Sequence, residues 1–449
     1  MKCIEDEIPF EVPEGWAWCK LNDIYNFIDY RGATPTKITN GIPLVTAKNV
    51  KSGYIDYTID DYISEEEFKE RQQRGISKKG DILFTTEAPL GNAALADMEK
   101  FSAGQRLITF QQYGSKDELI NYVMLMFILS DFFQQQLYVN KTGSTVAGIK
   151  AAILKTLWIP VPPYNEQLRI SNTLKSAINL IDSISKNKEI LSTSISNTKS
   201  KILDLAIRGK IVPQDPNDEP ASVLLERIRA EKEELIKQGK IKRDKKESVI
   251  FKGDDNSYYL RTGGVEESLE DWRFDDLPET WKICCLWELC DYGDCINVNT
   301  EDIAEDAWIL DLEDIEKDTG TVLKKVTKAQ RNSVSTKHKF HSGQVLYSKL
   351  RPYLNKVVLS DADGYCTSEI LPLEFKNCVL PEYARYYLMS GTFIAYANHC
   401  SYGVKMPRLG TTDGKKAIFS LPPLSEQKRI VETIDFCFMQ LNKISEALA

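Results

Sequence analysis

Nine lysine or arginine side chains and no carboxylate lie between Thr321 and Leu359, in a chain whose net charge is -8. Amide, hydroxyl and phenol side chains are interleaved with them. Cationic groups bind phosphates, and amides and arginines can read base edges, so this stretch predicts a nucleic-acid-binding face. A solvated surface run is the alternative. The candidate contact residues are Lys328, Arg331, Asn332, Lys337, Lys349, Arg351, Tyr353 and Asn355.

The first half of the chain has a weaker basic stretch, diluted by carboxylates. Glutamine and arginine can each make two hydrogen bonds to adenine or guanine in the major groove. The candidates here are Arg71, Gln72, Arg74, Gln105 and Arg106. Each half also contains a late glycine loop, 141–146 and 401–408, whose backbone N–H groups, hydroxyls and bases suit phosphate contact. The candidates in these two loops are Lys141, Ser144, Lys405 and Arg408.

Motifs for catalysis are missing. The chain has no G-x-x-x-x-G-K-[ST] loop and no G-x-G-x-x-G after a strand, so no phosphate cradle is visible. The Pro162-Pro163-Tyr164 segment lacks the Asn or Asp that an amino-methyltransferase motif needs first. Asp363 with Glu374-Phe-Lys376 mimics a nuclease triad, but the first half has no equivalent. We therefore predict no catalytic residue and no cofactor.

Metal sites and disulfides are not expected either. His338 and His341 lack a second ligand pair and are interpreted as exposed polar side chains rather than metal ligands. The ten cysteines have no regular spacing, which indicates reduced core thiols. No signal peptide is visible, and no apolar run approaches the roughly 18 residues that span a membrane. We expect a cytoplasmic protein.

The elements that position these residues are repeated once along the chain. Pro-Glu-x-Trp occurs at 13–16 and 278–281, and Pro-Pro-x-x-Glu-Gln-x-x-Ile occurs at 162–170 and 422–430. Two further matches keep the same order, Gly80 to Phe84 with Gly343 to Tyr347 and Pro89 to Asn92 with Pro352 to Asn355. A repeat this long predicts two copies of a domain, each followed by a helix.

Apolar residues recur with spacing four and three from Ile170 to Leu205, with no proline or glycine before Gly209. This heptad pattern predicts a coiled-coil helix of about 44 residues, or some 66 Å. The same spacing returns from Ile430 to Leu448, which offers a partner helix. Asn165 and Ser425 are the predicted N-caps.

The fold class expected is α+β, with two similar α/β domains separated by long helices. A second helix is predicted from Ala221 to about Gln238, followed by a charged, glycine-rich segment. The predicted layout is a first domain over 1–164, a helical region over 165–240, a flexible linker over 241–271, a second domain over 272–424 and a C-terminal helix over 425–449.

This pattern resembles the DNA specificity subunits of type I restriction–modification systems. The resemblance rests on the two paired motifs and on the segment from Gly209 to Pro220, and it covers essentially the whole chain. It implies two target-recognition domains that each read half of a split double-stranded DNA site, held apart by helices in an antiparallel coiled coil. It also implies two methyltransferase subunits and restriction (translocase–nuclease) subunits as partners, and catalysis in those partners.

Two other function classes remain open at this point. The chain could be a self-contained nuclease or DNA methyltransferase, against which the missing motifs argue. It could also be a coiled-coil adaptor without DNA contact, against which the basic stretch argues. Neither the target bases nor the spacer length follows from the sequence, because the reach of side chains to base edges depends on loop geometry.

Overall fold

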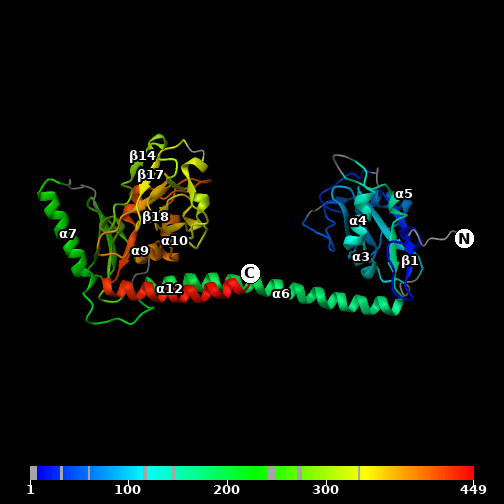
Figure 1. Cartoon of the computed structure of the whole chain (residues 1–449), viewed down its shortest axis with the longest axis horizontal. Coiled ribbons are helices and arrows are strands. Elements are labelled where there is room, and N and C mark those ends of the chain that lie inside the picture. Colours follow the sequence, from blue (N-terminus) through cyan, green and yellow to red (C-terminus); the bar gives the residue numbers. More distant parts are fainter. Residues whose placement is uncertain are drawn as a thin grey trace. The chain divides into compact units, whose positions relative to one another are not determined.

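The computed structural model describes residues 8–30, 34–58, 61–114, 119–143, 147–240, 248–255, 257–270, 276–331 and 334–448. The chain divides into two compact units, 1–185 and 186–449. Figure 1 labels the elements of both units.

The first unit is built on a central antiparallel sheet in the order β2-β8-β5-β6. A smaller sheet, β4-β3-β7, contains one parallel pair, and β1 pairs with β9. The strands are β1 (Ala17–Lys20), β2 (Tyr25–Asp29), β3 (Ile42–Val45), β4 (Tyr62–Ile63), β5 (Ile82–Thr86), β6 (Leu90–Leu95), β7 (Ser102–Ala103), β8 (Leu107–Gln112) and β9 (Trp158–Val161). The helices are α1 (Leu21–Ile24), α2 (Glu65–Arg71), η2 (Gln72–Arg74), α3 (Asn121–Leu129), α4 (Asp131–Val139) and α5 (Ala151–Leu154).

Strand β5 is apolar on both faces because both faces are covered. Ile82 and Phe84 point into a core that includes side chains of α3 and α4, and Phe84 stacks on Phe110 at 5.3 Å. Leu83, between them, points into a second core with Val45 of the small sheet. Successive strand residues face opposite sides of a sheet, so an uninterrupted apolar run belongs in a middle layer.

The second unit repeats this plan. Its central sheet has the order β19-β18-β21, its second sheet the order β14-β17-β20-β15-β16 with β15 parallel to β20, and β13 pairs with β22. The strands are β13 (Lys282–Cys285), β14 (Ile296–Val298), β15 (Trp308–Leu310), β16 (Val326–Thr327), β17 (Lys337–Phe340), β18 (Val345–Ser348), β19 (Val357–Leu359), β20 (Gly364–Thr367), β21 (Ile370–Leu373) and β22 (Ile418–Leu421). The helices are α8 (Leu286–Leu289), η4 (Thr300–Asp302), η5 (Leu312–Asp314), η6 (Lys328–Gln330), η7 (Pro352–Leu354), α9 (Pro381–Leu388), α10 (Gly391–His399) and α11 (Thr411–Lys416).

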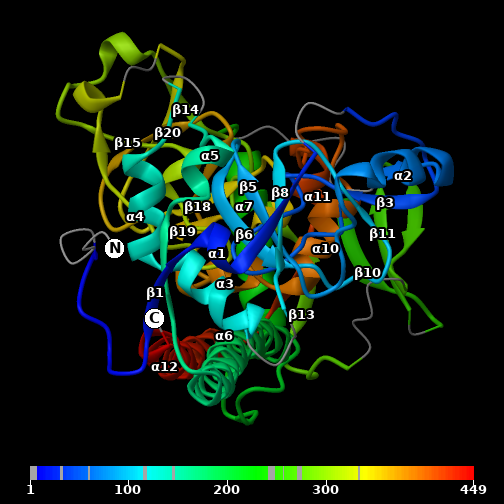
Figure 2. The same ribbon diagram turned by 90° about the vertical axis from the view of Figure 1, so that its right-hand side faces the viewer.

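The two predicted rods are helices. The first is α6 (Tyr164–Ala206) and the second is α12 (Leu424–Ala447). Within the second unit they run antiparallel: Lys199 Nζ donates to Asn442 Oδ1 at 2.6 Å, whereas Ile207, just beyond α6, accepts from Ser420, just before α12. Figures 1 and 2 show α12 lying alongside α6. Ile434 of α12 is buried in one cluster with Leu203 and Ala206 of α6. The two cross-contacts confirm the antiparallel pairing that the resemblance implied.

The N-cap prediction is wrong for both rods. α6 already begins at Tyr164 and α12 at Leu424, so Asn165 and Ser425 lie inside the first turn. Pro423 is the N-cap of α12, with φ -50 and ψ 143. A proline fits there because its fixed φ is compatible with a residue just before a helix.

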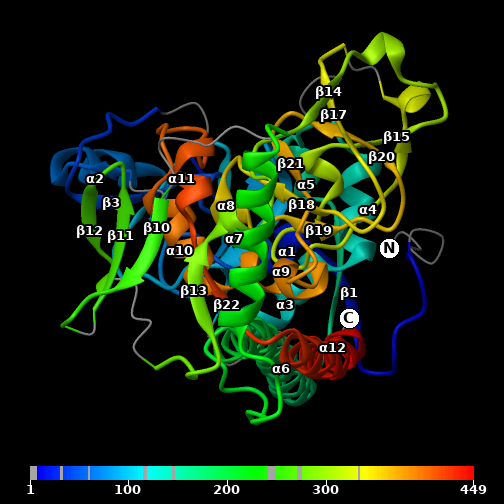
Figure 3. The ribbon, with the colours of Figure 1, turned by 90° about the vertical axis from the view of Figure 1, so that its left-hand side faces the viewer.

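The predicted flexible linker differs from the structure. Strands β10 (Ser248–Lys252), β11 (Tyr258–Thr262) and β12 (Val265–Ser268) form an antiparallel sheet, and residues 241–247, 256 and 271 of the predicted linker lie outside the described residues. Ile250 and Leu260 pack against Ile283 and Ile418 of the β13–β22 pair. These few apolar residues are spaced as strand positions within a charged sequence, so composition alone hid them. Figure 3 shows this sheet beside β13, and near it α7 (Ala221–Lys237).

The cysteines behave as predicted in the described part of the chain, where all nine are free thiols. Cys19 and Cys284 occupy the same repeat position, and each contacts a backbone carbonyl of the paired strand, Ile159 and Phe419. Burial raises the pKa of the Cys19 thiol to about 12, with a further contribution from Asp23. These thiols are therefore protonated core groups at neutral pH.

Candidate nucleic-acid interface

In the second unit, the predicted basic stretch and the predicted glycine loop come together. Lys349 N donates to Glu369 O at 3.0 Å, and Leu409 N donates to Lys349 O at 3.0 Å. Arg351 N donates to Pro407 O at 2.7 Å. We call this group of segments, residues 349–353, 369 and 401–408, loop cluster 2.

The first unit contains the equivalent, loop cluster 1, formed by residues 86–89, 105–106, 141–143 and 147–148. Thr86 N donates to Arg106 O at 2.9 Å, and Ile149 N donates to Thr86 O at 3.0 Å. The isolated β-bridges of the two clusters also correspond. Gly148 bridges both Glu87 and Thr142, as Arg408 in loop cluster 2 bridges both Leu350 and Tyr402.

The turn that follows β5 in the first unit and β18 in the second is also similar. Ala88 and Arg351 each precede a proline and adopt left-handed backbone conformations, with φ of 47° and 50°. Few non-glycine residues adopt this conformation, so its occurrence before the proline of both turns is a shared backbone feature, although the Ala88-Pro89 peptide bond is cis and the Arg351-Pro352 bond is not. The clusters therefore share a backbone frame.

Each cluster carries one arginine–glutamate ion pair, and the two pairs use different positions of the shared frame. In loop cluster 1, Arg106 Nε lies 3.1 Å from Glu87 Oε1. In loop cluster 2, Glu369 stands at the position of Arg106 and pairs with Arg408, whose Nη2 lies 2.8 Å from Glu369 Oε1. The hydrogen bond and charge of Glu369 raise the pKa of Arg408. The two clusters thus carry opposite charges at one matching position, that of Arg106 and Glu369. Their ion-pair partners differ, because Glu87 matches Leu350 and Arg408 matches Gly148.

Exposed cations and aromatic rings surround these pairs. Lys405 is exposed, as are Tyr402 and Tyr353, with 62% and 47% of their surface accessible. In loop cluster 1, Lys141 is exposed and its ammonium lies over the Tyr138 ring, 5.2 Å from the ring centroid. Flat rings beside free ammonium groups suit contact with bases and phosphates.

Three predicted contact residues of the second unit are engaged inside it instead. Arg331 pairs with Asp311 at 2.6 Å and with Asp314 at 2.5 Å. Burial by itself lowers the pKa of Arg331, but the hydrogen bond and charges of these carboxylates outweigh it and raise the pKa. Lys337 is 2% exposed and lies 3.8 Å from Asp311, and Lys328 lies 3.0 Å from Glu305.

Predicted contact residues of the first unit also have internal partners. Arg71 donates to Ala103 O at 2.9 Å and lies over the Tyr30 ring, and burial lowers the pKa of its guanidinium. Arg74 donates to Asp29 O at 3.1 Å. Gln72 is half-buried beside Arg71, and Gln105 donates to the Thr34 hydroxyl.

The remaining candidates have mixed positions. Lys349 and Arg351 are half-buried within loop cluster 2. Asn355 is 8% exposed and donates to Met389 O at 3.4 Å, so it supports the turn. Ser144 and Asn332 lie outside the described residues.

Sequence reasoning missed Tyr402, Glu87 and Glu369 as members of the clusters. Tyr402 stands next to Gly403 in the predicted phosphate loop, and an aromatic residue in such a loop was a usable signal. The two glutamates had none, because their arginine partners are 19 and 39 positions away in the sequence.

The histidines and the apparent nuclease triad have separate roles in the structure. His338 was expected to be exposed, but it is 7% exposed on β17 and its Nδ1 contacts Ile370 O at 2.8 Å. Asp363 accepts from Ser342 N, while Glu374 pairs with His341 at 2.8 Å. In the described ranges, no three His, Cys, Asp or Glu side chains are grouped to hold a metal ion.

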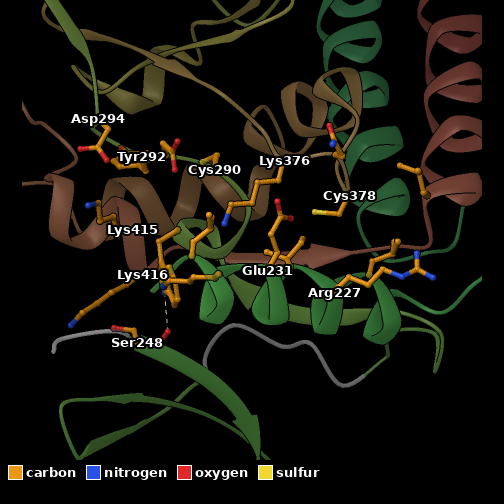
Figure 4. A pocket seen from close by; sticks show the side chains of 18 of the residues that line it. Arg227, Glu231, Ser248, Cys290, Tyr292, Asp294, Lys376, Cys378, Lys415 and Lys416 are labelled. Atoms are coloured by element: carbon orange, nitrogen blue, oxygen red, sulfur yellow. Dashed lines mark hydrogen bonds between the residues drawn. The ribbon is translucent and has the colours of Figure 1, made fainter. Parts of the chain in front are cut away.

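A cavity of about 1140 Å³ lies elsewhere in the second unit, between α7 and the segments around α8 and α11 (Figure 4). Lys376, Lys415 and Lys416 line it together with Glu231 and Asp294, so its charges are mixed. None of the predicted contact residues lines it. Among the described helices, none is long and apolar enough to cross a membrane.

Comparison with known proteins agrees with this architecture. The Type I restriction modification DNA specificity domain family matches residues 13–192 and 278–447. The Escherichia coli type I restriction enzyme EcoAI specificity subunit is 26% identical, over 98% of this chain and 80% of its own length. The EcoEI specificity subunit of the same species is 24% identical over 100% of this chain and 82% of its own length.

Solved structures show the same fold. The HsdS subunit from Thermoanaerobacter tengcongensis aligns with a TM-score of 0.52 at 16% identity, covering 98% of this chain and 93% of that one. A chain from a structural study of complex assembly and conformational transition of the type I R-M system aligns with a TM-score of 0.60 at 16% identity, covering 98% and 94%. The chain therefore belongs to the type I restriction–modification DNA specificity family, in which it is a specificity subunit that carries the family's domain twice.

Proposed function

We propose that this specificity subunit reads a bipartite DNA site, with loop cluster 1 on one half-site and loop cluster 2 on the other. The observation that carries the proposal is the repeated backbone frame, which presents different side chains in its two copies. A shared frame lets both domains approach duplex DNA in an equivalent way, and different side chains let them select different bases.

The side chains divide into two roles in this proposal. Lys141, Arg351 and Lys405 contact phosphates and set the position of the domain, because phosphate contacts carry no sequence information. The Arg106–Glu87 and Arg408–Glu369 pairs lie where base edges are read. Arginine can donate two hydrogen bonds to one guanine, and glutamate can accept a hydrogen bond from the cytosine amino group. The opposite charges of Arg106 and Glu369 at one matching position then make the two half-sites different.

The predicted residues with internal partners take a supporting role. Arg331 and Lys337 hold the loops around Asp311 in the second unit, and Arg71 holds the turn that ends at Gln105 in the first. Arg74, Lys328 and Asn355 also have internal partners and take the same supporting role. Gln72, Lys349 and the two candidates outside the described residues, Ser144 and Asn332, remain proposals for contact with the DNA backbone.

The subunit acts in this proposal without chemistry of its own. Methyltransferase subunits and restriction subunits supply catalysis and assemble on the helices. The middle of α6 supports this, because Leu180, Ile181 and Ile184 are 58–61% exposed and have no covering side chain among the described residues. An apolar helical stripe of this kind suits packing by helices of a partner.

The test compares Lys405→Gln with Lys282→Gln, an exposed lysine on β13 outside the cluster. In complex with the methyltransferase subunit, Lys405→Gln should weaken binding to all DNA sequences and lower the salt slope by about 0.9, because one phosphate contact is lost. Lys282→Gln should leave the slope unchanged. Mobility-shift titrations at several salt concentrations measure both.

Methylome sequencing of a host with and without the gene then identifies the bipartite site. Arg408→Ala should relax or abolish selection at one half-site only. Relaxed selection at both half-sites, or an unchanged methylome in the Arg408 variant, would contradict the assignment of one cluster to each half.

A further inference from the structure

The start of α12 is covered by the segment that follows α6. A Cβ at Gly209 would lie 2.5 Å from Pro278 Cγ, so the glycine backbone packs directly on this proline. Gln214 donates to Glu426, which also accepts from Trp281 Nε1 at 3.0 Å. We call the covered surface, Pro278, Trp281, Glu426 and Arg429, the Trp281 site.

An ion pair between Arg429 and Asp218 also joins the covering segment to this surface. Arg429 Nη2 lies 2.6 Å from Asp218 Oδ2, and Asp218 is almost fully covered. The covering segment therefore supplies three features in order: a glycine at the helix end, a glutamine amide five positions on, and a carboxylate four positions after that.

The first unit contains the same surface, the Trp16 site, formed by Pro13, Trp16, Glu166 and Arg169. The backbone frames match, since Trp16 N donates to Pro13 O and Trp281 N donates to Pro278 O, both at 3.0 Å.

The neighbouring glutamines match as well. Gln167 Oε1 accepts from Ile120 N at 2.7 Å and Gln427 Oε1 accepts from Leu380 N at 2.8 Å. The two sites therefore hold the same groups in the same local geometry.

The Trp16 site differs in having no covering segment among the described residues. The indole Nε1 of Trp16 is buried without a hydrogen-bond partner, whereas Trp281 donates to Glu426. Glu166 is half-buried where Glu426 is 1% exposed, and Arg169 is exposed where Arg429 pairs with Asp218. Buried N–H groups in native proteins are normally bonded, so an orphaned one points to a missing partner.

We propose that the Trp16 site docks an extended segment with the spacing Gly-x4-Gln-x3-Asp, of the same chemistry as the segment that covers the Trp281 site. The amide of its glutamine binds Glu166, which then turns to accept from Trp16, and its aspartate pairs with Arg169. The occupied Trp281 site shows the chemistry of the occupant, because the two surfaces carry the same tryptophan, glutamate and arginine.

Two differences predict a weaker and exchangeable contact. Ser420 donates to Ile207 O at 2.8 Å, but its counterpart is Pro160, which has no donor. Thr280 donates to Gln214 at 3.1 Å, but its counterpart is Gly15. The occupant of the Trp16 site therefore makes two fewer hydrogen bonds.

The experiment uses the full chain labelled with ¹⁵N at tryptophan and a synthetic peptide with the sequence of residues 207–220. Trp16→Phe assigns the Trp16 indole resonance. Titration with the peptide should shift that resonance and leave the Trp281 resonance unchanged. Arg169→Glu should weaken peptide binding at least tenfold, and a peptide carrying Asp218→Lys should restore it.

Arg429→Glu is the matched control at the occupied site, and it should not change the affinity measured at Trp16. The proposal is overturned if 1 mM peptide leaves the Trp16 resonance in place, or if the peptide shifts only Trp281.

Discussion

At the residue scale, Glu426 shows how tertiary contacts change an ordinary side chain. Burial raises the pKa of its carboxyl above the ordinary value of 4.5, although hydrogen bonds from Gln214 and Trp281 oppose this. The folded state therefore keeps a proton at pH values where the unfolded state has lost it. Just above pH 4.5, this carboxyl makes the free energy of unfolding fall as pH rises.

Glu426→Gln should remove this decline, because an amide does not titrate. The expected change is in the slope of the unfolding free energy against pH, by at most about 1.4 kcal/mol per pH unit for one proton. Urea titrations between pH 4.5 and 7 measure it. Parallel profiles for the parent and Glu426→Gln would contradict the argument.

At the element scale, α6 has a covered part and an open part. Ile434 of α12 is fully buried in a cluster that also contains Leu203 and Ala206 of α6, whereas Ile184 of α6 is 58% exposed. Ile434→Ala should lower the free energy of unfolding by about 2–5 kcal/mol, because it leaves a cavity in the seam. Ile184→Ala should change it by no more than about 0.5 kcal/mol in the chain alone. Chemical denaturation separates the two.

Ile184→Ala should nevertheless weaken assembly with the methyltransferase subunit if the open part of α6 docks a partner helix. Pull-down at graded salt measures this. Unchanged assembly in the Ile184 variant would place partner docking elsewhere on the helices.

At the scale of the whole molecule, the proposed function makes helix length a determinant of the DNA site. Insertion of one heptad into both α6 and α12 adds about 10.5 Å to each helix, or about three base pairs of DNA at 3.4 Å each. The spacer between the half-sites should lengthen, while the half-site bases stay the same, because neither loop cluster changes. Methylome sequencing of the variant reads both quantities, and altered half-site bases would refute the prediction.

The sequence was sufficient for the repeat, the helical rods and the family, because each of these is a linear pattern. The heptad spacing of α6 and the paired Pro-Pro-x-x-Glu-Gln-x-x-Ile motifs stand in the sequence without reference to distant residues. The sequence also singled out the loop segments, because Lys349, Arg351 and Lys405 were all predicted contact residues. In the structure, Lys349 and Arg351 lie beside the glycine loop that contains Lys405.

Only the tertiary structure decided which of the predicted cationic side chains are enclosed by carboxylates of the protein and which stand in a loop cluster. Arg331 and Arg351 belong to the same basic stretch, yet Arg331 is enclosed by Asp311 and Asp314 whereas Arg351 stands in loop cluster 2. Residues distant in the chain determine that difference, since an ion pair depends on the distance between charges in space and not on composition. For the same reason, the unfilled Trp16 site is invisible in the sequence, where its motif is the same as that of the filled Trp281 site.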